Sequence, residues 1–112
     1  MSNKNIPESI KELTEEFVNR MDQLYGERLH KVILFGSYAR GDYREDSDID
    51  YLVVLNDEDI KPYEEISNLS PTTFDLSLKY LMSVSAVPVS RNKFDHYGSP
   101  LLKNVREDGI LL

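Results

Sequence analysis

Two uninterrupted apolar runs constrain the fold of this 112-residue chain more than any other feature. They are Val32–Phe35 and Tyr51–Leu55, and both are rich in β-branched or aromatic residues. Short runs of this composition predict buried strands. Neither run approaches the roughly 20 apolar residues that a membrane span needs. We therefore expect two core strands, at 30–35 and 49–55.

Helical patterns lie on either side of these runs. Between residues 6 and 24, apolar residues recur at steps of three and four, which is the pattern of one helix face. Two prolines suit the first turn of a helix. One is followed by a helix-breaking pair of residues and the other by a glycine, so each predicts a further helix. The expected helices are 7–25, 61–69 and 100–108. No internal repeat is present, so we expect one mixed α/β domain over residues 1–112.

The segment 72–81 alternates strictly between apolar and polar residues. This period of two predicts a half-exposed strand, with Asp75 on its polar face. The next segment, 83–97, is interrupted by Pro88, and we predict a loop with a weak helix there.

Composition narrows the range of functions. The net charge is −7, with 20 acidic and 13 basic residues, which argues against binding a nucleic-acid backbone. The absence of cysteine excludes disulfides, thiolate catalysis and zinc–thiolate sites. With neither a signal peptide nor a membrane span in the pattern, we expect a cytoplasmic protein. An acidic site can still bind a single nucleotide, because divalent cations reverse the local sign of charge.

The most informative segment, 36–50, joins the two predicted core strands. Asp48 and Asp50 are two residues apart at the start of the second strand, so both carboxylates project from one face. Such a pair repels itself unless a cation lies between its members, and Mg²⁺ that also holds substrate phosphates suits this ligand set. If the strand of Asp75 neighbours 49–55, that residue supplies a third carboxylate. Three carboxylates can hold two metal ions about 3.5–4 Å apart for in-line attack on phosphorus.

Gly36 and Ser37 begin the same segment and suit a phosphate. A glycine allows a tight turn and a close backbone approach, and Ser37 offers a hydroxyl and neighbouring N–H groups. Arg40 is a candidate phosphate or partner contact, with a solvent-exposed or ion-paired arginine as the alternative. The segment fails as a P-loop, because Asp42-Tyr43 stands where Lys and Ser/Thr are required. It also fails as an EF-hand, because the sixth position lacks the required glycine.

These residues also carry a family resemblance. Ten residues separate Ser37 from Asp48, which gives the Gly-Ser-x10-Asp-x-Asp signature of the DNA polymerase beta-like nucleotidyltransferase superfamily. The fuller wording Gly-Ser-x-Ala-Arg-Gly…Ser-Asp-Ile-Asp, the small size and the ending 99–112 resemble the minimal nucleotidyltransferase (MNT) subgroup. The resemblance implies a small mixed β-sheet backed by helices that binds ATP with Mg²⁺, two ions in all. Its catalytic metal ligands would be Asp48, Asp50 and Asp75, with Gly36 and Ser37 holding the phosphates.

The resemblance also implies a partner. MNT proteins are often the antitoxins of two-gene modules whose partner is a helical HEPN-type ribonuclease toxin, and they are similar to enzymes that transfer AMP to a tyrosine of that toxin. Two alternatives stay open. One is a non-catalytic antitoxin that neutralises its partner by binding, and the other is transfer to a small molecule such as an aminoglycoside. Enzymes of the latter kind usually carry an extra helical domain, and the sequence leaves the oligomeric state and the preferred base open.

Overall fold

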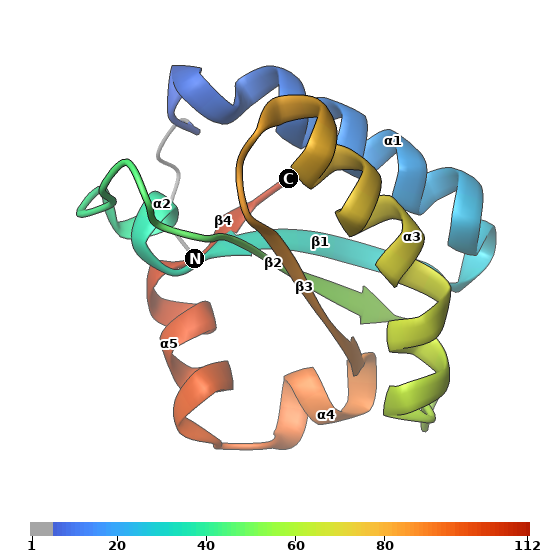
Figure 1. Cartoon of the computed structure of the whole chain (residues 1–112). Helices are drawn as coiled ribbons and strands as arrows, with labels where there is room; N and C mark the ends of the chain where they lie inside the picture. The colour runs from blue at the N-terminus through green and yellow to red at the C-terminus, as the bar shows by residue number, and fades with distance from the viewer. Residues whose placement is uncertain (1–5) are drawn as a thin grey trace.

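A four-stranded mixed sheet forms the centre of the computed structural model, which describes residues 6–112 (Figure 1). The strand order is β3-β2-β1-β4. β1 (Leu29–Phe35) is antiparallel to both β2 (Ile49–Leu55) and β4 (Ile110–Leu111), and β2 is parallel to β3 (Val84–Ser90). The two strands predicted from apolar runs are therefore neighbours at the centre of the sheet. The mixed α/β fold with helices around a small sheet is confirmed.

Helices cover both faces of this sheet (Figure 1). α1 (Lys11–Tyr25) and α3 (Pro62–Tyr80) lie over one face, and α4 (Arg91–His96) and α5 (Pro100–Asp108) lie over the other. Alternate residues of the central strands divide between two cores, which explains why their apolar runs are unbroken. The α1/α3 core includes Phe17, Val32, Leu34, Tyr51, Val53, Leu69 and Leu76, and the α4/α5 core includes Ile33, Leu52, Val54, Phe94, Leu102 and Val105.

Short elements complete the N-terminal half. The 3-10 turns Glu8–Ile10 and Gly26–Arg28 flank α1, and the four-residue helix α2 (Ser37–Arg40) follows β1 directly. The predicted helices at 7–25 and 100–108 are confirmed to within a few residues. α5 begins as its sequence predicted, because the Ser99 hydroxyl accepts from the Leu102 N–H at 3.3 Å and Pro100 occupies the first turn.

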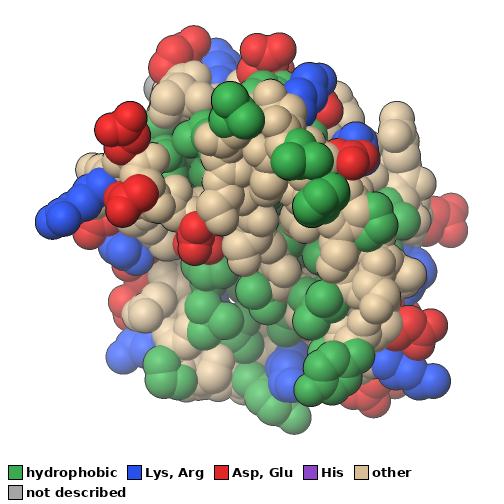
Figure 2. Space-filling model, viewed as in Figure 1, with side chains coloured by type: hydrophobic (Ala, Val, Ile, Leu, Met, Phe, Trp, Pro, Cys, Tyr) green, Lys and Arg blue, Asp and Glu red, His purple; other side chains and the backbone are tan. Residues whose placement is uncertain are grey.

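The predicted strand at 72–81 is wrong, because this segment continues α3, which also contains most of the predicted helix 61–69. The buried residues of α3 recur with the helical period and are Glu65, Leu69, Thr72 and Leu76. The alternation of apolar and polar residues was misleading here. It places Phe74 and Leu78 on one buried face with Leu76, but in the structure these two side chains are 65% and 60% exposed. Hydrophobic side chains accordingly gather on the surface over α3 in Figure 2. Pro71 lies inside the helix without ending it.

The segment 83–97, predicted as a loop with a weak helix, instead holds β3 followed by α4. Pro88 is tolerated in β3 because this strand lies at the edge of the sheet, where a missing N–H leaves no partner unsatisfied. α3 is the crossover that the parallel pairing of β2 and β3 requires. Within residues 6–112, no helix is both long enough and apolar enough to span a bilayer.

Candidate active site

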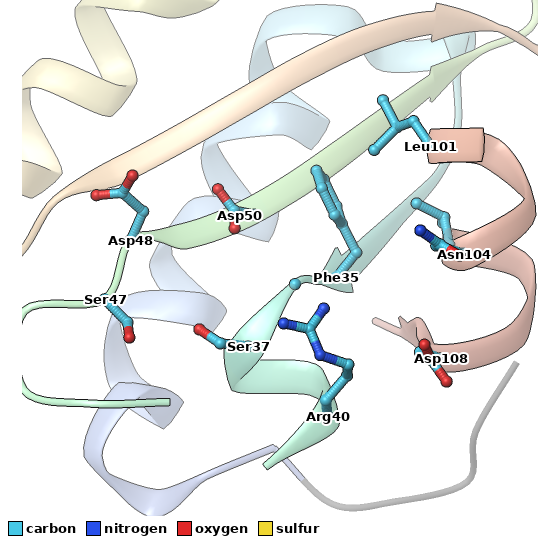
Figure 3. A pocket seen from close by; sticks show the side chains of 11 residues that line it. Phe35, Ser37, Arg40, Ser47, Asp48, Asp50, Leu101, Asn104 and Asp108 are labelled. Atoms are coloured by element: carbon cyan, nitrogen blue, oxygen red, sulfur yellow. The ribbon is translucent and has the colours of Figure 1, made fainter. Parts of the chain in front are cut away.

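A cleft of about 390 Å³ lies where the ends of β1 and β2 meet α5 (Figure 3). The site residues predicted from segment 36–50 all line it, although ten residues separate Ser37 from Asp48. β1 and β2 are antiparallel, so the end of one strand lies beside the start of the other. The lining residues are Phe35, Gly36, Ser37, Arg40, Ser47, Asp48, Asp50, Leu101, Asn104, Val105 and Asp108.

The start of β2 places two carboxylates in the cleft. Ile49 is fully buried in the α1/α3 core, and its N–H donates to the Ser83 carbonyl at 2.8 Å. Because successive side chains of a strand alternate, Asp48 and Asp50 project to the opposite side, toward α5. Both residues line the cleft, and Figure 3 shows Asp50 between Asp48 and Phe35, with the Asp48 carboxylate at the outer edge of the site. Asp48 is exposed and Asp50 is partly buried.

The electrostatics of this pair favour a bound cation. Burial raises the pKa of the Asp50 carboxyl above its ordinary value, and the charge of Asp48 raises it further. Arg40 opposes both effects by lowering the pKa of Asp50. Two carboxylates that repel each other in a half-buried site are a donor set that fits Mg²⁺, whose other ligands are usually water and substrate phosphate oxygens.

The structure does not bring Asp75 to this pair. Asp75 lies on α3, over the other face of the sheet, and its carboxylate forms an ion pair with Arg20 at 2.8 Å. The expectation that it completes a two-ion site depended on a strand at 72–81, which is a helix. The residue beside Asp50 on β3 is Ser85. Across the described residues 6–112, no group of three or more His, Asp or Glu side chains is arranged to hold a metal ion.

Gly36 determines how closely the turn after β1 approaches Asp50. Its φ is +77° and its ψ is −158°, a combination that is essentially restricted to glycine. A Cβ at this position would collide with the Asp50 carboxylate. Ser37 follows at the start of α2, and its hydroxyl makes no hydrogen bond to another residue in the described part of the chain. That hydroxyl is therefore available to a ligand in the cleft.

Aromatic stacking supports the residues that line the cleft. Tyr38 and Tyr43 stack with ring centroids 4.2 Å apart, which holds the loop after α2 against that helix. Tyr51 stacks on Phe17 at the same centroid distance, and its hydroxyl is 2.7 Å from the Thr14 hydroxyl. None of the three tyrosines lines the cleft. Their rings therefore pack within the protein and do not face a ligand in the cleft.

The sequence did not predict that α5 forms one wall of the cleft. Leu102 and Val105 of α5 pack in the α4/α5 core, so Leu101, Asn104 and Asp108 border the cleft beside them. The helical spacing of these residues was visible, but the sequence did not show that α5 returns to the sheet next to β1. That return is set by β4, whose Ile110 pairs with Leu34 of β1.

Comparisons with known proteins agree with this geometry. The model of the family described as "Nucleotidyltransferase domain" matches residues 14–111. The chain belongs to this nucleotidyltransferase family. Among curated relatives, "Putative protein adenylyltransferase MJ0604" of Methanocaldococcus jannaschii is 40% identical over 99 residues, which cover 88% of this chain and 92% of that protein. A second protein of the same organism, "Putative protein adenylyltransferase MJ0141", is 36% identical over 68% of this chain and 75% of its own length.

Solved structures share the nucleotidyltransferase fold. A crystal structure described as "a putative nucleotidyltransferase from Sulfolobus solfataricus" has a TM-score of 0.63 at 21% identity and covers 98% of this chain and 90% of its own. A toxin-antitoxin complex with AMP-PNP has a TM-score of 0.60 at 21% identity, over 87% of this chain and 70% of its own. A complex of tri-AMPylated HEPN toxin with MNT antitoxin from Shewanella oneidensis has a TM-score of 0.53 at 20% identity, over 89% and 69%.

Proposed function

We propose that this nucleotidyltransferase uses Mg²⁺ and ATP to transfer AMP to a tyrosine hydroxyl of a partner protein. The partner in this proposal is a HEPN-type toxin, which the chain neutralises as its antitoxin. The observation that carries the proposal is the placement of Asp48 and Asp50 opposite Gly36 and Ser37 in one cleft. The relatives named as protein adenylyltransferases support the reaction, and the toxin-antitoxin complexes among the structural neighbours support the partner.

The residues of the cleft divide the work between charge and position. Asp48 and Asp50 would hold Mg²⁺, which when bound neutralises charge on the triphosphate. The Ser37 hydroxyl donates to a phosphate oxygen, and Gly36 keeps that oxygen close to Asp50 because it has no side chain in between. Arg40 adds a positive charge on the same side of the cleft, and its guanidinium also forms an exposed ion pair with Asp42 at 3.4 Å, which is the alternative that the sequence left open. Such groups act by positioning and by stabilising charge, which is most of what transfer at phosphorus requires.

The transfer itself exchanges one bond at phosphorus for another. The tyrosine oxygen attacks the α-phosphorus of ATP, and the bond from that phosphorus to the oxygen bridging to the β-phosphate breaks. Pyrophosphate leaves with the bonding electrons, and the hydroxyl proton passes to solvent. The exposed side of Asp48 leaves room for the acceptor to approach, and α5 forms the opposite wall of the cleft.

The intact mass of the partner tests this function. The product of the gene next to this one is incubated with the chain, Mg²⁺ and each of the four nucleoside triphosphates in turn. We expect a gain of whole AMP units with ATP, and none when Mg²⁺ is removed by chelation. A stable complex with no mass gain would instead favour an antitoxin that acts by binding alone.

A further inference from the structure

The α5 side of the cleft carries an inference that rests on the proposed function and deepens it. We propose that Phe35 and Leu101 form the slot for the nucleobase, and that the Asn104 amide selects adenine there. ATP then lies with its phosphates at Gly36 and Ser37 and its base against α5.

The cleft has a charged end and an apolar end, as a nucleotide has charged phosphates and a base with apolar faces. At one end lie Ser37, Arg40 and the carboxylate pair, which suit phosphates and a cation. At the other end lie the Phe35 ring and the Leu101 side chain, and Leu101 is 42% exposed (Figure 3). A flat ligand with apolar faces and a polar edge fits this half, and the base is the part of ATP with that chemistry.

Phe35 is placed to hold such a base. It is the last residue of β1, pairs with Asp50 across the sheet, and directly precedes Gly36. Its ring makes no stacking contact with another aromatic ring among the described residues, unlike Phe17 or Tyr38. Stacking on an aromatic ring strengthens the binding of a base in other nucleic-acid-binding proteins, and every base has a face that can stack. Phe35 is therefore expected to supply affinity rather than selectivity.

Asn104 has the chemistry that distinguishes adenine. Its amide makes no hydrogen bond to another residue in the described part of the chain, and it points from α5 toward the cleft in Figure 3. A side-chain amide donates to N7 and accepts from N6 of adenine, a bidentate pairing that guanine cannot reproduce because it carries an acceptor at O6. The amide therefore favours adenine over guanine.

The Asp48 side of the cleft suits the acceptor. An attacking hydroxyl must approach the α-phosphorus opposite the leaving pyrophosphate, and its protein must remain outside the chain. Asp48 is exposed and offers such an approach, and it lies apart from the base slot that Phe35, Leu101 and Asn104 form on the α5 side (Figure 3). Binding of the base there also leaves the exposed side open for a large partner.

Calorimetric binding of Mg·ATP and Mg·GTP to the full chain, without any partner, tests the inference. We expect the wild type to bind ATP at least about tenfold more tightly than GTP. Asn104→Ala should lose about tenfold in ATP affinity, so that the two nucleotides bind almost equally. Asn19→Ala, an exposed asparagine on α1 away from the cleft, is the matched control and should behave as the wild type. Phe35→Leu should weaken ATP and GTP by similar factors.

Several results would overturn the inference. An ATP-to-GTP ratio that Asn104→Ala leaves unchanged, with ATP binding intact, would refute base selection by α5 while the proposed function stands. An Asn104→Ala variant that binds ATP normally but transfers AMP to the partner more slowly would assign the wall to the acceptor. Unchanged nucleotide binding by Phe35→Leu would refute the slot. A wild type that binds no nucleoside triphosphate would instead refute the proposed function itself.

Discussion

Replacing Gly36 by alanine should damage both the fold and the site, and the structure gives the size of the effect. Two separate costs add at this position. The backbone has φ +77° and ψ −158°, a strained conformation for any residue with a Cβ, which costs about 1–3 kcal/mol. The new methyl group would also collide with the Asp50 carboxylate, which must move to make room. We expect the free energy of unfolding to fall by about 2–4 kcal/mol in total.

Gly41 provides the matched control. It also has a positive φ, +91°, but a Cβ there would meet nothing within 4 Å. Gly41→Ala should therefore cost only about 1–2 kcal/mol of backbone strain, and it should leave nucleotide binding intact. Urea denaturation gives the stability of each variant, and calorimetry gives its affinity for Mg·ATP. Gly36→Ala should lose at least about tenfold in that affinity, because the displaced Asp50 no longer faces the phosphates.

A double-mutant cycle isolates the contact with Asp50. In an Asp50→Ala background the colliding oxygen is gone, so Gly36→Ala should cost about 1 kcal/mol less than it does in the wild type. The reasoning is refuted if the cost of Gly36→Ala is the same in both backgrounds. It is also refuted if Gly36→Ala is no more destabilising than Gly41→Ala, or if it binds Mg·ATP normally.

Three further predictions concern residues around the cleft. Asp75→Ala should leave the rate of AMP transfer within about twofold, since its exposed ion pair with Arg20 lies on α3; a loss beyond about tenfold in a transfer assay would restore Asp75 to the site. Thr14→Val and Tyr51→Phe should each lower the free energy of unfolding by about 1–2 kcal/mol, because each leaves one buried hydroxyl unpaired. Urea denaturation of the double variant should show a loss well below the sum of the two single losses, and a loss equal to that sum would contradict the prediction. Gly109→Ala should cost about 1–3 kcal/mol, because its Cβ would lie 2.6 Å from Ile33 Cγ2; unchanged thermal stability would contradict that packing.

Local patterns predicted the centre of this protein well. The apolar runs around Ile33 and Leu52 are buried on both faces of the sheet, and they correctly predicted two core strands; that the strands are neighbours came from the structure. The separation of Ser37 and Asp48 in the sequence does not part them in the fold, because β1 and β2 are antiparallel and the connection 36–48 returns the chain to the same end of the sheet. The spacing of the two carboxylates in the sequence was therefore enough to predict a cation-binding pair.

The failures have one physical origin, which is that burial depends on tertiary contacts. Between residues 72 and 81, only Thr72 and Leu76 are buried, while the apolar Phe74 and Leu78 face solvent. A pattern that assumed all apolar residues to be buried therefore predicted a strand. The prediction that Asp75 lies at the site depended on that strand and was wrong for the same reason. The contribution of α5 was equally invisible, because nothing local to Asn104 shows which strand that helix packs against.

We infer that Asp48 and Asp50 serve the chemistry of the site and not the stability of the fold. Asp48→Asn keeps the size of the side chain and removes its charge, so it tests the claim directly. We predict that its free energy of unfolding stays within about 0.5 kcal/mol of the wild type or rises, because Asp50 loses a repelling neighbour. In the same preparation, Mg²⁺-dependent transfer of AMP to the partner, followed by intact mass, should fall at least about a hundredfold. A stable Asp48→Asn protein that transfers AMP at the wild-type rate would contradict the account.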